Sequence, residues 1–174
     1  MREMIKNRLF NKANSSLEDK FIFAIKQSMK SLEIKDPLFL ATLLATPGFA
    51  ELESLFDKVD PINIYRKSLD FKVLIGKGVL QELRTLAYKL FVNIDHEWPE
   101  GKGQRKLLGI IWSYLTLAGD NNVKKNCVES INHSSMTISK AALGALKPLD
   151  SVETNEASNL FYNLWNDNAV VLDS

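Results

Sequence analysis

The sequence has little of the residues from which small proteins most often build chemical sites. Its 174 residues include a single cysteine, Cys127, and two histidines, His96 and His133. One cysteine cannot form an intramolecular disulfide or a cysteine-built metal site, and it fits a reducing compartment. We therefore expect a cytoplasmic protein. Because Val123 and Val128 flank Cys127, we interpret it as a buried apolar residue and not as a catalytic thiol.

Long apolar runs and an excess of charge of one sign are also lacking. No stretch of about 18 apolar residues occurs, which argues against a membrane-spanning helix, and the charged N-terminus does not resemble a signal peptide. The 22 basic and 21 acidic residues leave a net charge of +1, so we expect neither nucleic acid nor a membrane as a partner. The basic side chains of Arg2, Lys6, Arg8 and Lys12 are interpreted as a solvated helix face.

Helical periodicity dominates what is present. Apolar residues recur at steps of three and four through most of the chain, and only Ala169–Leu172 carries a weak strand pattern. Met4, Ile5, Leu9 and Phe10 are spaced as one face of a helix that begins upstream. About seven to nine short helices predict an all-α fold, a single domain over 1–174 built from stacked antiparallel helix pairs as a HEAT- or armadillo-like superhelix. An irregular helical bundle is the alternative.

Three helix-start signals lie between residues 36 and 61. Asp36-Pro37, Thr46-Pro47 and Asp60-Pro61 each place a capping oxygen before a proline at the first helical position. They predict a helix from Pro37, a short helix that ends near 56–57, and a long helix from Pro61. The segment 38–45 is apolar nearly all round, which predicts that it lies deep between its neighbours.

Downstream of residue 61 the pattern predicts further helices and one loop. The first helix should bury a face that contains Ile62, Tyr65, Leu69 and Val73, and the glycines of 76–78 should interrupt or bend it. Residues 95–103 are predicted to form a loop, and helices are predicted over 107–118, 123–131, 138–146 and 155–165. Trp112 and Trp165 are expected to anchor the stack.

The order of several motifs resembles that in one known family. The residues that carry the resemblance are Leu43, Pro47, Glu51, Leu52, Leu55, Phe56, Asp57, Val59, Asp60, Pro61 and Ile62, then Arg105, Leu107, Leu115 and Gly119, then Met136, Thr137, Ala141, Ala142, Leu143, Ala145 and Leu146, and finally Phe161, Tyr162, Trp165, Asn168 and 170–173. Over roughly residues 16–174 this order is similar to the C-terminal helical domain of the bacterial aminopeptidase N type of zinc metallopeptidase, a gluzincin. The resemblance favours the superhelical stack.

The catalytic signature of that family is missing from this chain. The signature is His-Glu-x-x-His on one helix with a downstream glutamate as the third zinc ligand. His96-Glu97 begins in the same way but continues Trp-Pro-Glu, so the second ligand is absent and Pro99 would break the helix. His133 is expected at a helix end. The Gly-Ala-Met-Glu-Asn motif is missing as well, so we assign no catalytic, cofactor-binding or metal-binding residue to this chain.

The resemblance implies a parent hydrolase that releases N-terminal amino acids from peptides with one zinc ion. This chain would be a non-catalytic segment of the parent, inactive alone, that shapes and closes access to the active-site chamber. Its expected partners are the catalytic zinc domain of the same parent chain and the parent's peptide substrates, and its cut ends would promote self-association. The alternative is an independent helical-repeat scaffold for protein–protein interaction. An open reading frame that runs upstream through His-Glu-x-x-His would favour the parent enzyme.

Overall fold

The computed structural model describes residues 1–10, 12, 14–32, 36–56, 60–93 and 100–172, and every regular element within them is helical. The elements are α1 (Arg2–Leu9), α2 (Ser15–Leu32), α3 (Pro37–Leu44), α4 (Phe49–Glu53), α5 (Pro61–Gly78), α6 (Leu80–Asn93), α7 (Lys102–Leu117), α8 (Asn121–Glu129), the 3-10 helix η1 (Ser130–Asn132), α9 (Met136–Leu146), α10 (Val152–Trp165) and α11 (Ala169–Leu172). The all-α prediction is confirmed. The weak strand pattern at the C-terminal end was misleading, because that segment forms α11.

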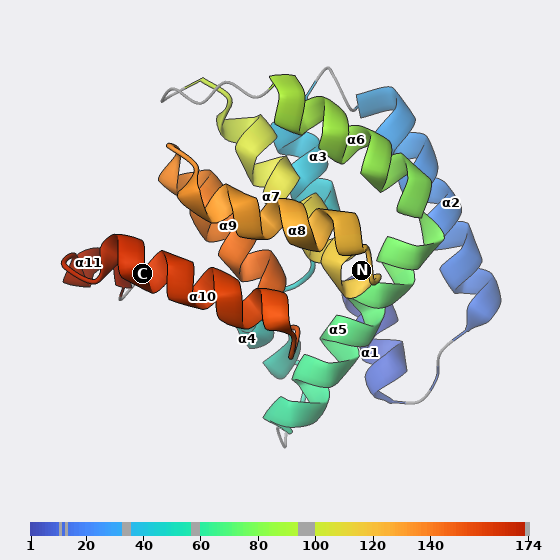
Figure 1. Cartoon of the computed structure of the whole chain (residues 1–174). Helices are drawn as coiled ribbons and strands as arrows, with labels where there is room; N and C mark the ends of the chain where they lie inside the picture. The colour runs from blue at the N-terminus through green and yellow to red at the C-terminus, as the bar shows by residue number, and fades with distance from the viewer. Residues whose placement is uncertain (11, 13, 33–35, 57–59, 94–99, 173–174) are drawn as a thin grey trace.

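Helix α7 lies at the centre of the fold. It packs against α3, α5, α6, α8 and α9 (Figure 1). Leu107, Leu108, Ile111 and Leu115 are almost fully buried, at the spacing of successive helical turns. A Cβ atom on Gly109 would lie 2.9 Å from the Cβ of Ala141, so the glycine lets α9 approach closely. Apolar burial around α7 is therefore the main stabilising contribution.

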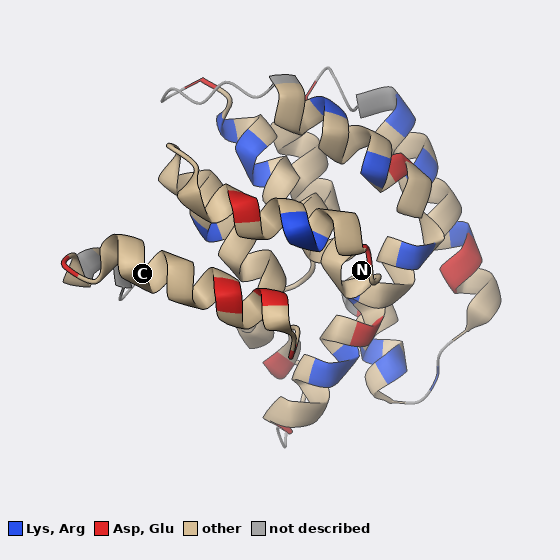
Figure 2. Ribbon diagram, in the orientation of Figure 1, with Lys and Arg blue, Asp and Glu red and all other residues tan. Residues whose placement is uncertain are grey.

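The other helices stack on either side of α7. Helices α8, α9 and α10 pack against one another and lead toward α11, while α2 packs on α3 and α1 packs on α5. In Figure 1, α10 and α11 lie at one side of the molecule and α2 at the opposite side. Figure 2 shows Lys and Arg distributed over several helices, and no single helix collects them. Pairs of neighbouring helices thus form the stack that the periodicity predicts.

Two of the three predicted helix starts are confirmed. The Asp36 carboxylate accepts the Phe39 N–H at 2.8 Å, and the Asp60 carboxylate accepts the Asn63 N–H at 3.0 Å. Both carboxylates satisfy an amide hydrogen that has no partner inside the helix.

The third predicted helix start is wrong. Residues 45–48 carry no helix, α4 begins at Phe49, and its N-cap Gly48 makes no side-chain capping bond. The glycine after Pro47 disfavours helix at that point. Helix α4 also ends at Glu53, earlier than the predicted 56–57, and residues 57–59 lie outside the described part of the chain.

The predicted buried face of α5 is wrong. The structure buries Ile64, Phe71 and Ile75, whereas Ile62 is 63% and Tyr65 53% exposed. Apolar residues occupy more than one side of this helix, so periodicity alone could not indicate which side meets α7.

The glycines at the end of α5 do not bend it where expected. Gly76 stays helical, and a Cβ atom there would lie only 2.5 Å from the carbonyl oxygen of Tyr114 in α7. The interruption falls at Val79, between α5 and α6. Gly76 is therefore needed for a close helix crossing and not for a turn.

The prediction that α3 is buried all round is also wrong. Leu40, Ala41 and Leu44 are fully buried, but Phe39 is 54% and Leu43 39% exposed. That second apolar side of α3 is therefore only partly covered and leaves an exposed apolar strip on the surface.

The N-terminal helix finds partners within this chain. Met4, Ile5 and Leu9 are buried, so this predicted apolar face packs against other parts of the same chain. Arg8 donates two hydrogen bonds to the Glu18 carboxylate, at 2.7 and 2.9 Å, and is therefore paired instead of solvated as predicted. Phe10 remains 48% exposed.

Candidate functional site

Of the two histidines, His133 lies in the described part of the structure. His133 follows η1, as the predicted helix-end position requires, and its Nδ1 accepts the N–H of Ser135 at 2.9 Å. His96 lies outside the described residues, as do residues 95–99 of the predicted loop. Within the described ranges, no three His, Cys, Asp or Glu side chains are placed to hold a metal ion. These residues do not fit the zinc site of the family, and we derive no reaction step through zinc.

Cys127 lies in the core of α8. The side chain is fully buried, and burial raises the pKa of its thiol to about 12. A protonated, inaccessible thiol is a poor nucleophile. The interpretation of Cys127 as a buried apolar residue is confirmed.

Asp120 is a carboxylate with several partners in the described structure. Its Oδ1 accepts the N–H groups of Asn122 and Val123 at 3.1 and 3.2 Å, which caps α8, and its Oδ2 accepts from Arg84 Nε at 2.5 Å. Burial alone would raise the pKa of Asp120, but the hydrogen bonds and the positive charge of Arg84 together hold it below its ordinary value. Its partner Arg84 lies in α6, 36 positions away in the sequence, so no local pattern could indicate it.

A pocket of about 280 Å³ opens beside this pair, between α6, α7 and α8. Its walls include Tyr88, Phe91, Trp112 and Asn126. Trp112 is 2% exposed and tilts against Phe91 with ring centroids 5.9 Å apart, so the prediction that it anchors the stack is confirmed. Because both oxygens of the Asp120 carboxylate are already engaged, the pocket offers no free general base.

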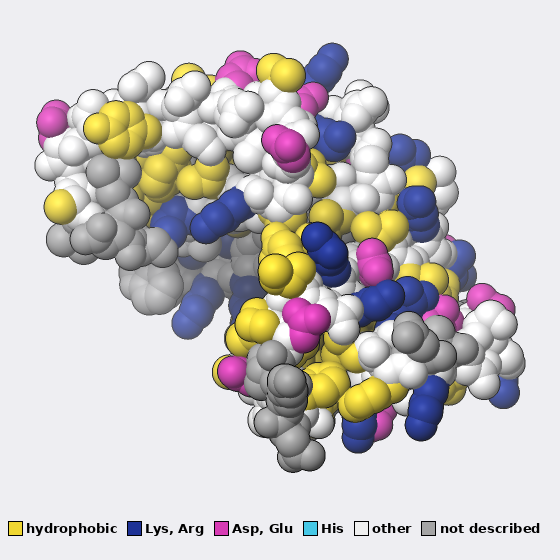
Figure 3. All heavy atoms as spheres, turned by 90° about the horizontal axis from the view of Figure 1, so that it is seen from below, with side chains coloured by type: hydrophobic (Ala, Val, Ile, Leu, Met, Phe, Trp, Pro, Cys, Tyr) yellow, Lys and Arg dark blue, Asp and Glu magenta, His cyan; other side chains and the backbone are white. Residues whose placement is uncertain are grey.

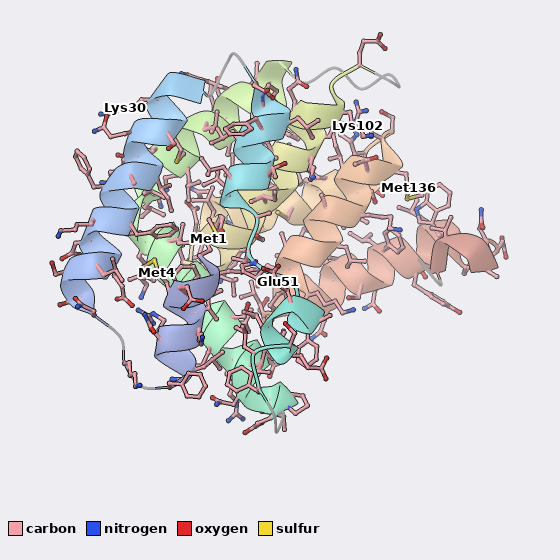
Figure 4. All side chains as sticks on the ribbon, turned by 180° about the vertical axis from the view of Figure 1, so that it is seen from behind. Met1, Met4, Lys30, Glu51, Lys102 and Met136 are labelled. Carbon is pink, nitrogen blue, oxygen red and sulfur yellow. The ribbon has the colours of Figure 1, made fainter. Side chains whose placement is uncertain are left out.

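The exposed strip of α3 borders a wider hollow, which we call the α3 groove. It has a volume of about 550 Å³ and is lined by Met1, Phe39, Thr42, Leu43, Ala45, Thr46, Pro47 and Glu51. In Figure 4, Met1 and Glu51 lie near the lower end of α3 on the face turned toward the viewer. Glu51 is the one charged side chain in this lining, so the groove is suited to apolar contacts.

A second hollow of about 260 Å³ adjoins the α3 groove and shares Thr46 and Pro47 with it. Phe49, Tyr65 and Lys72 also line this hollow, and burial lowers the pKa of the Lys72 amine. Figure 3, seen from below, shows further apolar side chains exposed between charged ones. Exposed apolar surface of this kind is typical of interaction sites.

Trp165 is only partly buried, so the prediction that it anchors the stack is only partly right. Phe161, one turn earlier on α10, is buried, and Trp165 is partly buried and packs against the core. Its indole nitrogen is buried and makes no hydrogen bond within the described structure. None of the described helices is long and apolar enough to cross a membrane.

A stack of short helices around one central helix defines an all-α helical-repeat domain. The chain belongs to the family described as "Domain of unknown function (DUF3458_C) ARM repeats", whose model matches residues 1–174. This family is the C-terminal domain of M1 aminopeptidases, which confirms the resemblance read from the motifs.

The fold is also similar to that of a solved aminopeptidase structure. Aminopeptidase A of Legionella pneumophila, crystallised in complex with aspartic acid, is 20% identical with a TM-score of 0.67, over 86% of this chain and 19% of that chain. The matched region is thus about a fifth of that protein's length. No curated protein matches this chain.

Proposed function

We propose that this chain is a non-catalytic part of an aminopeptidase and that it shapes and closes access to the chamber where a separate zinc domain releases N-terminal amino acids from peptides. The observation that carries the proposal is the family match over residues 1–174. The similar aminopeptidase has about four-fifths of its length outside the matched region, which leaves room for a catalytic domain there. The zinc ion, the peptide substrates and the cytoplasmic location all belong to this proposal.

A domain that limits access to a chamber must hold its shape, and buried hydrogen bonds between helices stabilise the centre of this fold. The Tyr114 hydroxyl donates to the carbonyl oxygen of Leu44 at 2.5 Å, and the Thr116 hydroxyl donates to that of Ala145 at 2.7 Å. These buried hydrogen bonds tie α7 to α3 and α9, in addition to apolar packing. Such a wall would admit extended peptides and exclude folded proteins by size.

The experiment uses the full-length protein and substrates of increasing size. We expect hydrolysis of an aminoacyl reporter and of short peptides, and no release of the N-terminal residue from a folded protein. The isolated 174-residue chain should hydrolyse none of them, with or without added zinc. Cleavage of folded proteins as fast as peptides, or activity of the isolated chain, would contradict the proposal.

Two variants test whether this domain sets the size limit for substrates. Trp112→Leu in the full-length protein leaves a small cavity beside α7, so we expect weaker discrimination against large substrates and an unchanged rate on the aminoacyl reporter. The matched control is Tyr88→Leu, because Tyr88 is an exposed aromatic residue on α6. Equal discrimination in both variants would mean that other parts of the protein set the size limit.

A further inference from the structure

Lys72 in α5 is a charged residue that the described fold leaves without a counter-charge. Its side chain is partly buried, and burial lowers the pKa of the amine below its ordinary value. No carboxylate of the described residues forms an ion pair with it, whereas Lys67 on the same helix lies 3.9 Å from the Asp70 carboxylate. A partly desolvated ammonium ion without a partner is unfavourable, so an anion bound beside Lys72 would offset part of that cost.

The hollow of about 260 Å³ that Lys72 lines, which we call the Lys72 hollow, lies between α4, α5 and the segment before α4. Figure 1 shows α4 beside the first part of α5, and the two helices are in contact. Among the described residues of the lining, Lys72 carries the only charge. The others are the hydroxyl-bearing Thr46, Tyr65 and Ser68 and the uncharged Pro47, Gly48, Phe49, Leu52 and Ile64. The hollow therefore combines a positive charge with apolar walls.

The polar groups of the Lys72 hollow are arranged along one side of α5. Tyr65, Ser68 and Lys72 follow one another at steps of three and four positions, which brings them to the same face of the helix. Gly48 lies on the opposite wall, and a Cβ atom there would meet nothing within 4 Å, so the hollow is open at that point. Its volume is below the ~300–1,000 Å³ of pockets for drug-sized ligands, which limits the occupant to about the size of one amino-acid residue.

We propose that the Lys72 hollow binds a small carboxylate that carries an apolar side chain, with the carboxylate beside the Lys72 ammonium group and the side chain against Phe49 and Tyr65. The charge of Lys72 disfavours a cation. Inorganic phosphate has no apolar part with which to use the walls. The C-terminal residue of a peptide and a free amino acid both present the proposed chemistry. The proposal does not require this chain to be part of an aminopeptidase, so either inference can fail alone.

Ligand titration of the 174-residue chain, followed by NMR chemical shifts, tests the proposal. The probe is N-acetyl-L-phenylalanine, and we expect a dissociation constant on the order of a millimolar for a ligand of this size. The shifts should concentrate on residues 46–49 and 65–72. N-acetyl-L-phenylalanine amide lacks the carboxylate and N-acetylglycine lacks the side chain, so both should bind at least about tenfold more weakly. Equal binding of the amide, or no saturable shifts with the probe, would overturn the proposal.

A matched pair of variants tests the role of Lys72. Lys72→Gln should weaken binding of N-acetyl-L-phenylalanine at least about tenfold, because the charge-assisted hydrogen bond is lost. The control is Lys77→Gln, since Lys77 is exposed on the same helix and does not line the hollow; it should change binding by less than about twofold. Equal weakening in both variants would overturn the proposal, because general attraction by surface charge would then explain the binding. The comparison of ligands needs no variant, so the proposal stays testable even if Lys72→Gln fails to fold.

A further titration with L-phenylalanine distinguishes the two sources of the ligand. Its ammonium group would lie near that of Lys72, so we expect it to bind more weakly than N-acetyl-L-phenylalanine, as a site for a peptide end requires. Tighter binding of L-phenylalanine that Lys72→Gln abolishes would also support the site and would identify a free amino acid as its ligand. Binding of L-phenylalanine that is unaffected by Lys72→Gln would contradict the assignment of the carboxylate to Lys72.

Discussion

Arg84 in α6 donates its Nε–H to Oδ2 of Asp120 across 2.5 Å, although 36 positions separate the two residues in the sequence. The Asp120 side chain is 3% exposed and also caps α8 through two backbone N–H groups. One carboxylate therefore joins α6 to the turn between α7 and α8. This link stands at the edge of the aromatic pocket that contains Trp112.

Asp120→Ala should destabilise the 174-residue chain, because the cap of α8 is lost and the Arg84 guanidinium loses its partner. Loss of the cap alone is expected to cost about 1 kcal/mol. Asp120→Asn is the control, since asparagine can still cap the helix but carries no charge. Urea unfolding should rank the wild type first, then Asp120→Asn, then Asp120→Ala. Equal losses in the two variants would mean that the ion pair, and not the cap, carries the effect.

Acid should weaken the fold partly through this same carboxyl group. The pKa of Asp120 lies below its ordinary value of 3.8 in the folded state, so the folded chain binds this proton less readily than the unfolded chain. Its contribution to stability is thus full above that ordinary value and is lost as the pH falls through the lower, folded-state pKa. Urea midpoints measured from pH 6 down to pH 2 should fall more in the wild type than in Asp120→Asn. If the urea midpoints of the two proteins fell by the same amount as the pH is lowered, the pKa of Asp120 would not be lowered in the folded state.

Gly76→Ala should destabilise the chain, and Gly144→Ala should not. A Cβ atom at residue 76 would lie 2.5 Å from the Tyr114 carbonyl oxygen, which is backbone and cannot move aside easily. We expect a loss of about 1–3 kcal/mol from such overpacking. Gly144 in α9 has nothing within 4 Å of that position, so alanine there should stabilise the helix by up to about 1 kcal/mol. Thermal unfolding measures the stability of both variants. If Gly76→Ala were as stable as the wild type, α5 and α7 would lie farther apart than the structure has them.

Trp112→Ala should cost roughly 3–5 kcal/mol in the isolated chain, because a nearly fully buried indole is removed and a cavity remains. Tyr88→Ala is the control, since Tyr88 is 72% exposed and its loss should change stability by less than about 0.5 kcal/mol. Chemical unfolding followed by circular dichroism measures both. A change under about 1 kcal/mol at Trp112 would mean that the side chain is replaced by water or by neighbouring residues at little cost.

Much of the candidate site lay beyond sequence reasoning, for reasons that particular residues illustrate. The α3 groove was missed because the segment 38–45 is apolar on both sides, and nothing in its composition indicates that only one side has a neighbour. The Arg84–Asp120 pair was missed because neither residue belongs to a recognisable motif. The capping role of Asp120 could have been predicted, because Asp120 follows the helix-ending Gly119 and directly precedes the next helix, where a capping carboxylate is expected.

The sequence by itself determined the helical class, the starts at Pro37 and Pro61 and the family, because caps, periodicity and motif order are properties of neighbouring residues. Asp36 and Asp60 act on amides three positions away, so their effect could be predicted locally. Only the tertiary structure decided which face of each helix is buried. Ile64 is buried while Ile62 is exposed. A glycine is needed at position 76 because the backbone carbonyl of Tyr114 in α7 lies too close for a side chain. Those outcomes depend on contacts between segments far apart in the chain, which local spacing does not encode.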